Sequence, residues 1–423
     1  MTSTANMPRQ AALTLIAHVL DEGRLLSEVT GPVLGPLSPP ERARAGRLAA
    51  GTLRWMDRAD RALGPFLRMK PWPKVHNALR LAIYEIYVEG AAEHGAVSAA
   101  VDLVRSDGHA AGQAGLTNGV LRNVLRKGGW DDLPLPRLPK PLRKRLLAIY
   151  GKEVVAAMEA VFAATPPLDL TPKDGDGAAL AERLGGIVLP TGSVRLTVKG
   201  QVSALDGYDS GDWWVQDAAA ALPARALDVQ PGERVLDMCA APGGKTLQLA
   251  AAGADVTALD NSETRMVRMH ENLARCGLPA QVVVADALTY DAPLFDAVLL
   301  DAPCSATGTI RRHPDLPQAK RDLDFSPLVA QQSAMIDAAL RLVKPGGRVV
   351  FCTCSLLPEE GEEQVSAALA RHPGLTVETG PLNLPGIHDD WILLGIGLRL
   401  RPDYQSEMGG MDGFFITRFR RPE

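Results

Sequence analysis

Two cysteines stand where reactive side chains are commonly displayed, each shortly after an apolar run. The run at 295–300 leads into Asp301 and Cys304, and the run at 348–352 leads into Cys354. Ligands of open α/β sheets bind at the carboxyl ends of the strands, so both thiols would face a substrate. A thiolate there can attack an electrophilic carbon and form a covalent intermediate. A free cysteine is more often a small buried hydrophobe, and the pair therefore needs a joint explanation.

A loop of small residues begins at the end of a third expected strand, at 234–239. It consists of Cys239, Ala240, Ala241, Pro242, Gly243, Gly244 and Lys245. Small residues before an expected helix let backbone N–H groups come close to a ligand. Cys239 occupies the position where a phosphate-binding Walker loop needs glycine, and the dinucleotide fingerprint Gly-x-Gly-x-x-Gly is missing. The loop predicts a nucleotide-like ligand of another kind.

Acidic residues follow the next two expected strands. Asp260 ends the strand expected at 255–259, where a carboxylate can accept hydrogen bonds from ribose hydroxyls. Asp286 lies just beyond the strand expected at 281–284 and could hold the adenine side of a cofactor. A single acid at a strand end is more often a turn or cap residue. Acids on successive strands favour a nucleotide site.

The second half of the chain alternates expected strands with expected amphipathic helices. The strands are expected at 234–239, 255–259, 281–284, 297–300 and 348–352, and the helices at 246–251, 263–276 and 327–342. This alternation predicts an α/β fold, a Rossmann-like, doubly wound and largely parallel sheet. Its carboxyl edge would gather the small-residue loop, the acids and the two thiols.

The first half differs in pattern and in charge. Apolar residues recur at helical spacing over 11–20, 79–87 and 97–104, which predicts an all-helical bundle. We divide the chain into a helical domain at 1–130, a linker with a small α/β connector at 131–215, and a cofactor-binding domain at 216–423. Residues 1–150 carry 21 Lys and Arg against 13 Asp and Glu, whereas the remainder carries 24 against 36. A basic front module suits a polyanionic partner.

Composition excludes several classes of protein. The chain has 423 residues, 46% hydrophobic and 22% charged, and no apolar run long enough to cross a bilayer. Its five cysteines are odd in number and lie in the second half, unlike a disulfide framework, and their spacing does not fit a zinc site. We therefore expect a cytoplasmic monomer that binds neither a metal nor a membrane.

Several motifs resemble those of one enzyme family. The stretches 237–246, 301–305 and 353–355 are similar to the motifs of S-adenosylmethionine-dependent RNA (cytosine-5) methyltransferases, and 311–315 and 412–415 fit as well. Residues 5–128, with the basic segment 116–127, resemble the NusB family, whose helical bundles bind RNA. Together they most resemble the methyltransferases that act on bacterial 16S rRNA.

The resemblance implies a cofactor and a role for each site residue. S-adenosylmethionine would occupy the 239–245 loop with Asp260, Asp286 and Asp301. A thiolate adds to carbon 6 of cytosine so that carbon 5 becomes nucleophilic. Chemistry alone leaves either thiol as the nucleophile; the resemblance assigns attack to Cys354, proton removal and enzyme release to Cys304, and base orientation to Asp301.

The resemblance also implies RNA contacts after the Cys304 loop. Arg311, Arg312 and His313 would meet phosphates or bases of 16S rRNA. Residues 316–318, Leu-Pro-Gln, and 168–171, Leu-Asp-Leu-Thr, depart from the family pattern, which affects the RNA contacts and not the catalytic residues. Two alternatives stay open: another methyl acceptor such as tRNA, and a non-catalytic RNA-binding factor.

Overall fold

A computed structural model describes residues 6–197, 201–320 and 324–423. The chain divides into two compact units, one of residues up to 165 together with a segment that begins at Ile310, and one of 166–309 with 324–423. These boundaries differ from the predicted ones at 130 and 215. The long helix after the linker belongs to the first unit, and the small connector sheet belongs to the second. Within the described ranges, no helix is both long and apolar enough to span a membrane.

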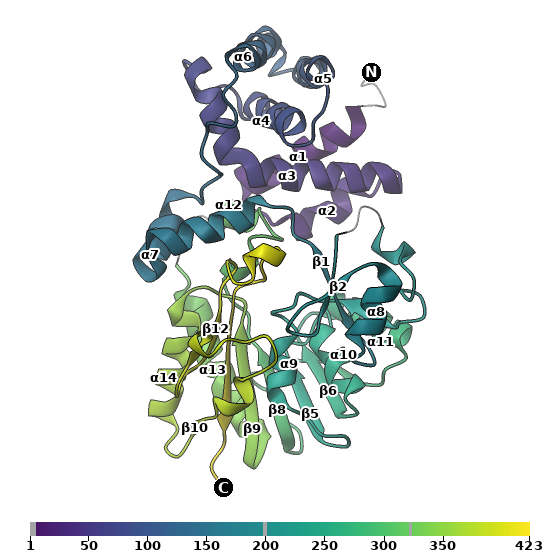
Figure 1. Cartoon of the computed structure of the whole chain (residues 1–423), viewed down its shortest axis with the longest axis vertical. Helices are drawn as coiled ribbons and strands as arrows, with labels where there is room; N and C mark the ends of the chain where they lie inside the picture. Colours follow the sequence, from purple (N-terminus) through teal and green to yellow (C-terminus); the bar gives the residue numbers. More distant parts are fainter. Residues whose placement is uncertain (1–5, 198–200, 321–323) are drawn as a thin grey trace. The chain divides into compact units, whose positions relative to one another are not determined.

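The first unit is the predicted helical bundle, which is therefore confirmed (Figure 1). Its helices are α1 (Met7–Glu22), α2 (Leu26–Leu34), α3 (Pro39–Leu63), α4 (Pro73–Tyr87), α5 (Glu93–Arg105), α6 (Ala114–Lys127), α7 (Lys140–Ala163) and the short α12 (Leu316–Ala319). The predicted apolar stripes are buried, among them Leu15 and Ile16 of α1 and Leu79 of α4. Helices α3 and α4 meet closely because Gly51 leaves room for the ring of Tyr84, which a Cβ would strike.

Residues 310–320 pack within this helical unit although they follow the Cys304 loop in sequence. Ile310 and Leu316 are buried, and the carboxylate of Asp315 accepts a 2.8 Å hydrogen bond from the backbone N–H of Leu26, in the first turn of α2. Arg54 of α3 donates to the carbonyl of Arg311 at 2.7 Å. Burial lowers the pKa of Arg54 to about 10. The segment is thus fixed by specific hydrogen bonds and not by apolar contact alone.

A small antiparallel sheet opens the second unit. It contains β1 (Leu168–Pro172), β2 (Ile187–Val188), β3 (Val194–Leu196) and β4 (Trp213–Val215) in the order β2-β3-β1-β4, with α8 (Gly177–Leu184) packed against it. Asp169 and Arg195 form a buried bidentate ion pair across β1 and β3, at 2.6 and 2.7 Å. Asp169 also accepts from the backbone N–H of Ala218, which ties the sheet to the chain beyond it.

The large sheet is the predicted doubly wound sheet, extended by antiparallel strands. Its parallel strands are β5 (Arg234–Met238), β6 (Asp255–Asp260), β7 (Gln281–Val284), β8 (Phe295–Asp301) and β9 (Val343–Thr353); the added strands are β10 (Thr376–Val377), β11 (Ile392–Leu393), β12 (Gly397–Leu400) and β13 (Phe414–Arg420). The order is β11-β12-β13-β9-β8-β5-β6-β7, with β10 paired to β13. Strands β5, β8 and β9 are central neighbours, so their carboxyl ends meet.

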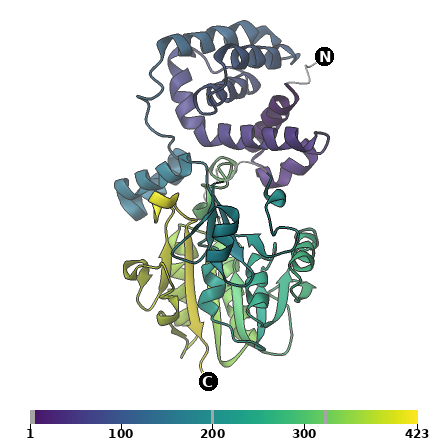
Figure 2. The same cartoon turned by 45° about the vertical axis from the view of Figure 1, so that its right-hand side comes forward.

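Helices cover both faces of this sheet, as the turned view in Figure 2 shows. They are α9 (Leu222–Leu227), α10 (Gly244–Ala251), α11 (Glu263–Cys276), α13 (Ser326–Leu342) and α14 (Glu362–Arg371). Alternate strand residues serve opposite faces: Val235 packs with α9 and α10, and Leu236 packs with α13 and α14. Burial on both faces explains why the central strands read as continuous apolar runs in the sequence.

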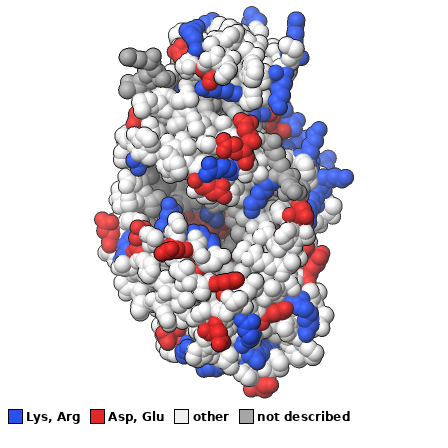
Figure 3. Space-filling model, turned by 180° about the vertical axis from the view of Figure 1, so that it is seen from behind, with Lys and Arg blue, Asp and Glu red and all other residues white. Residues whose placement is uncertain are grey.

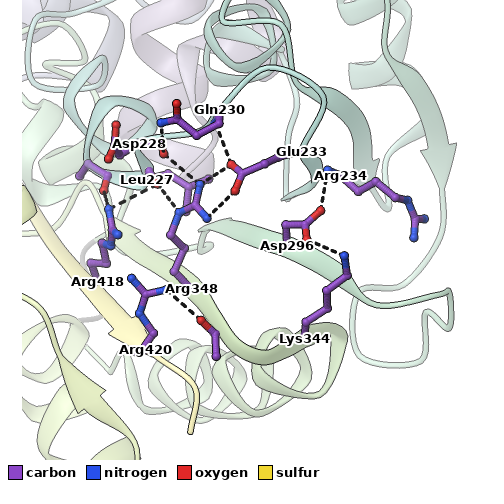
Figure 4. Close-up of polar contacts among 12 residues, drawn as sticks. Leu227, Asp228, Gln230, Glu233, Arg234, Asp296, Lys344, Arg348, Arg418 and Arg420 are labelled. Carbon is purple, nitrogen blue, oxygen red and sulfur yellow. Dashed lines mark hydrogen bonds and ion pairs between the residues drawn. The ribbon is translucent and has the colours of Figure 1, made fainter. Parts of the chain in front are cut away.

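Arginines bind the end of α9 at the opposite, amino edge of the sheet (Figure 4). Arg348 of β9 donates from Nε to the carbonyl of Leu227 at 2.6 Å and pairs with Glu233 at 2.5 Å. Arg418 of β13 donates to the carbonyl of Ala226 at 3.0 Å. The last carbonyls of a helix have no partner within it and carry partial negative charge, so guanidinium donors stabilise them. These cations therefore hold the fold together.

Replacing Arg348 should cost much more stability than replacing Lys344, which is drawn in the same view. Arg348→Met keeps the apolar stem but removes the shorter of the two bonds to the Leu227 carbonyl and the cation that pairs with Glu233, and we expect a loss of about 3 kcal/mol in the free energy of unfolding. Lys344 pairs with Asp296 with a side chain 46% exposed, so Lys344→Met should cost about 1 kcal/mol or less. Urea unfolding measures both; equal losses would refute the capping role.

Candidate active site

The two thiols lie in contact at the carboxyl edge of the large sheet. Strands β8 and β9 pair in parallel with Asp301 opposite Cys352, so the loops that follow them leave the sheet side by side. The Sγ atoms of Cys304 and Cys354 are 3.4 Å apart, and either can donate to the other. The backbone N–H of Gly308 also donates to the carbonyl of Cys354 at 2.9 Å. The structure thus brings together the two cysteines that the sequence singled out.

The environments of the cysteines differ. The hydrogen bond with Cys354, followed by burial, raises the pKa of Cys304 well above that of a free thiol, so Cys304 stays protonated near neutral pH. Burial also raises the pKa of Cys352, whose thiol donates to Asp301 at 3.4 Å. A thiol held in its neutral form suits proton transfer better than attack.

Lys245 and Asp301 form an ion pair beside the thiols. Lys245 Nζ lies 2.7 Å from Asp301 Oδ2, with the ammonium 5.5 Å from the ring centroid of Phe414. Burial alone would lower the pKa of Lys245, but the charge and hydrogen bond of Asp301, together with the charges of Cys352 and Asp237, outweigh it and the pKa is raised. Lys245 therefore stays charged, and it presents a fixed cation next to the reactive sulfurs.

A buried acid, Asp237, holds the loop that follows β5. Asp237 is 0% exposed, and its Oδ2 accepts a 2.6 Å hydrogen bond from Thr246 Oγ1, at the start of α10. Its Oδ1 has no hydrogen-bond partner among the described residues. Burial raises the pKa of Asp237 to about 7. Between Asp237 and Thr246, Cys239 adopts a positive φ of 61° and Gly243 one of 107°, and the chain turns sharply into the helix.

The predicted cofactor residues form a cradle at the start of α10 (Gly244–Ala251). Gly243 lies against Met269, which a Cβ would crowd at 3.2 Å, and Ala240, Ala241 and Pro242 lead into the turn. Asp260 Oδ1 accepts from Ser262 N–H and from Arg265. Its Oδ2 accepts a single long bond, 3.2 Å, from Ala241 N–H among the described residues. That oxygen retains the capacity to accept from a ribose hydroxyl.

Asp286 stabilises the turn in which it lies. Its carboxylate accepts from the N–H of Leu288 at 3.0 Å, and its carbonyl accepts from the N–H of Tyr290 at 2.9 Å. The side chain is exposed beyond β7, which leaves the other oxygen accessible. The turn role that a lone acid predicts is therefore present, and contact with a cofactor remains a proposal.

The three residues predicted to contact RNA differ in exposure. Arg311 is 1% exposed, and its contact with RNA remains a proposal. Arg312 and His313 are exposed. Two adjacent arginines in a polar stretch resemble a solvated face, and no signal in the sequence marks the first as buried.

Two side chains near the site, Gln216 and Glu360, were not singled out from the sequence. Gln216, after β4, accepts from Trp214 Nε1 at 2.8 Å and donates to Gln248 at 2.7 Å, close to Gly244. Glu360 binds the loops of both thiols. The run of glutamates around Glu360 predicts a solvated surface, and only its position shortly after Cys354 hinted at a role.

Comparison with protein families identifies both parts of the chain. A family model described as 16S rRNA methyltransferase RsmB/F matches residues 224–420, and the NusB family matches residues 6–126. The chain is 36% identical to ribosomal RNA small subunit methyltransferase B of Sodalis glossinidius, over 90% of this chain and 93% of the relative. It is 34% identical to the protein of that name from Klebsiella pneumoniae, over 90% and 95%.

Solved structures share the fold. The crystal structure of PH0851 aligns with a TM-score of 0.75 and 22% identity, over 99% of this chain and 100% of that one. A methyltransferase homolog protein from Pyrococcus horikoshii aligns with a TM-score of 0.55 and 27% identity, over 67% of this chain and 95% of that one. The predicted combination of a helical region with a Rossmann-like methyltransferase region is confirmed.

The buried Asp237 predicts a pH-dependent loss of stability in the protein without ligand. Its pKa rises from 3.8 to about 7 on folding, so the folded state binds the extra proton between these values and loses stability as pH rises. Asp237→Asn presents a similar acceptor to Thr246 and has no proton to lose. Relative to wild type, the variant should therefore gain up to about 1.4 kcal/mol per pH unit across this window.

Urea unfolding at pH 5 and pH 8 tests this directly. Other titrating groups cancel when the two proteins are compared at the same pH. A difference in the free energy of unfolding that is the same at both pH values would show that Asp237 does not titrate in this range.

Proposed function

Because the chain belongs to the RsmB/F family of 16S rRNA methyltransferases, we propose that it transfers the methyl group of S-adenosylmethionine to carbon 5 of a cytosine in 16S rRNA. The observation that carries this proposal is the contact between Cys304 and Cys354, 3.4 Å apart at the carboxyl edge of the sheet. Carbons 5 and 6 of a pyrimidine are bonded neighbours. Two thiols in contact can therefore act on one base, one by adding to carbon 6 and the other at carbon 5.

The cofactor would lie on the cradle between β5, β6 and α10. The N-terminus of α10, which follows the glycine-rich turn, would supply backbone N–H groups to it, and Oδ2 of Asp260 can accept from its ribose. The exposed oxygen of Asp286 is a further acceptor at this edge. S-adenosylmethionine supplies an electrophilic methyl group. The chain supplies the nucleophile, the proton acceptor and the charges that align them.

The thiols divide the reaction between them. The Cys354 thiolate adds to carbon 6, and the electron pair of the 5,6 double bond moves so that carbon 5 can attack the methyl group. Removal of the proton from carbon 5 then returns an electron pair to the ring, and the bond to the Cys354 sulfur breaks. Cys304, after losing its own proton to solvent, would be the base that takes the proton from carbon 5, and Cys354 leaves as a thiolate.

Asp301 orients the base in this scheme. An ionised carboxylate only accepts hydrogen bonds, so Asp301 would accept from the exocyclic amino group of cytosine. Lys245, at 2.7 Å, stabilises the carboxylate and the negative charge that builds on the ring after the thiolate adds. The target base must be unpaired or flipped out for a sulfur to reach carbon 6.

The helical unit offers basic surface for RNA. Figure 3 shows Lys and Arg side chains gathered where α6 and α7 lie. Arg122, Arg126 and Lys127 are exposed on α6, opposite the buried Leu121 and Val124. Exposed cations on one face of a helix can neutralise phosphates irrespective of sequence. Arg312 and His313 remain proposed RNA contacts after the Cys304 loop.

Replacing the thiols one at a time should separate their roles. Cys354→Ala should abolish methyl transfer because it removes the sulfur that is proposed to add to carbon 6. Cys304→Ala should still attack but release slowly, so that an RNA–protein adduct survives denaturing gel electrophoresis. An adduct that accumulates with Cys354→Ala would reverse the assignment.

Bisulfite mapping of RNA from a strain without the gene identifies the substrate. 16S rRNA should lose a 5-methylcytosine, and loss from tRNA alone would refute the 16S proposal.

Removing cations from α6 should weaken RNA binding without changing chemistry. The triple variant Arg122→Gln, Arg126→Gln, Lys127→Gln removes three exposed charges, and each lost phosphate contact reduces the slope of log affinity against log salt by about 0.7 to 0.9. Filter binding at several salt concentrations gives the slope, with kcat at saturating RNA as the control. An unchanged slope would exclude α6 from the RNA-binding surface.

A further inference from the structure

A buried carboxylate links the two thiol loops. We propose that Glu360 is a positioning residue that fixes the separation of Cys304 and Cys354 by binding the residue that follows each cysteine. Glu360 ends the short 3-10 turn η6 (Pro358–Glu360), and its side chain is 0% exposed. The proposal rests on the two-thiol chemistry proposed above.

The two oxygens of Glu360 bind different loops. Oε1 accepts a 2.8 Å hydrogen bond from the backbone N–H of Ser305, which follows Cys304. Oε2 accepts a 2.5 Å hydrogen bond from the hydroxyl of Ser355, which follows Cys354. The distance between the two carboxylate oxygens is fixed by covalent geometry. One rigid group therefore sets how far apart the backbones behind the two sulfurs can lie.

Gln332 of α13 completes the arrangement. Its Nε2 donates to Glu360 Oε1 at 3.1 Å and to the carbonyl of Pro303 at 2.8 Å, so Cys304 is held on both sides. Gln364 donates to Gln332 Oε1 at 3.3 Å and to the Val329 carbonyl at 2.7 Å, and so orients it. Glutamate and glutamine together connect the Cys304 loop to two helices.

Hydroxyl groups cross-link the same loops. The hydroxyls of Ser305, Thr307 and Ser355 lie 3.1 to 3.3 Å from one another. Thr353, the last residue of β9, donates from its hydroxyl to the carbonyl of Glu360 at 2.9 Å, which fixes the turn to the strand. Every contact named for Glu360 therefore leads to a residue within two positions of a reactive cysteine or to the helix that holds the Cys304 loop.

Stability alone does not account for a carboxylate at this position. Taking a carboxylate out of water is costly, and well-packed apolar groups in place of buried charged groups are often neutral or stabilising. Catalysis does account for it, because a shift of about 1 Å in a reacting group can reduce the rate about 100-fold. The charge of Glu360 also contributes to the raised pKa of Cys304, after the bond with Cys354 and burial.

Two substitutions of Glu360 distinguish positioning from charge. Glu360→Met has a similar size but accepts no hydrogen bond from either loop. Glu360→Gln can accept from Ser305 and Gln332 with its oxygen and donate to the Ser355 hydroxyl with its amide, so both loops remain bound. We expect kcat for RNA methylation to fall at least about tenfold in Glu360→Met, with KM for RNA unchanged, and Glu360→Gln to retain most of the wild-type kcat.

A measurement that does not depend on methylation accompanies the kinetics. A bifunctional thiol-alkylating reagent bridges Cys304 and Cys354, and mass spectrometry of the bridged peptides gives the yield. The yield should fall several-fold in Glu360→Met and return in Glu360→Gln. Should the wild type prove not to methylate cytosine, the proposed function fails, and the cross-linking yields still decide the role of Glu360.

Glu233→Met is the matched control for lost stability. Glu233 is also a carboxylate bound by polar groups of the second unit, but it pairs with Arg348 at the amino edge of the sheet (Figure 4). Its replacement should lower the melting temperature and leave both kcat and the cross-linking yield unchanged below the transition.

The outcomes that contradict the proposal are specific. Wild-type yield and kcat in Glu360→Met would overturn it. Equal inactivity of Glu360→Met and Glu360→Gln would show that charge and not hydrogen-bond geometry matters, which also overturns it. If Glu360→Met does not fold, Gln332→Leu makes the same test, since it releases the Pro303 side of the Cys304 loop and should lower yield and kcat in the same way.

Discussion

The pairing of β8 with β9 is the constraint on which the site depends. Asp301 lies opposite Cys352, so the loops carrying Cys304 and Cys354 leave the sheet at the same level. Side chains alternate between faces along a strand, and a slip of one residue would turn Cys352 and Asp301 to the wrong sides. The apolar side chains of both strands are buried beneath helices on both faces, which makes such a slip very costly. Burial of the sheet thus places the sulfurs.

Charge at the carboxyl edge imposes a second requirement. Lys245 is the cation that pairs with Asp301, and Asp237 lies buried close enough for both charges to affect its pKa. Buried charges are tolerated only when they are paired and hydrogen-bonded. Thr246, in the first turn of α10, donates to Oδ2 of Asp237, so the buried acid is tied to the helix that follows the glycine-rich turn. The loop, the helix and the ion pair form one interdependent unit.

The sequence predicted the regular elements well and the polar contacts poorly. Helix α11 begins and ends at the predicted residues, because its apolar spacing lies between a Ser262 cap and Gly277. A pattern of this kind depends only on residues that are close in the sequence. Arg311 and Glu360 were beyond such analysis, since burial of Arg311 depends on packing with the helical unit, and the donors to Glu360 lie 55 and 5 positions away. Distant partners leave no periodic signal.

The residues at the two edges of the large sheet have different functions. At the amino edge, Arg348 and Arg418 bind the final carbonyls of α9, and their other donors pair with the carboxylates of Glu233 and Glu378. At the carboxyl edge lie a thiol with a raised pKa, an acid with one oxygen that no described residue binds, and a glycine-rich turn, and a fold optimised for stability would avoid all three. Parallel strands make this separation possible, because every strand starts at one edge and ends at the other. Stabilising contacts can therefore accumulate at the amino edge without restricting the chemistry.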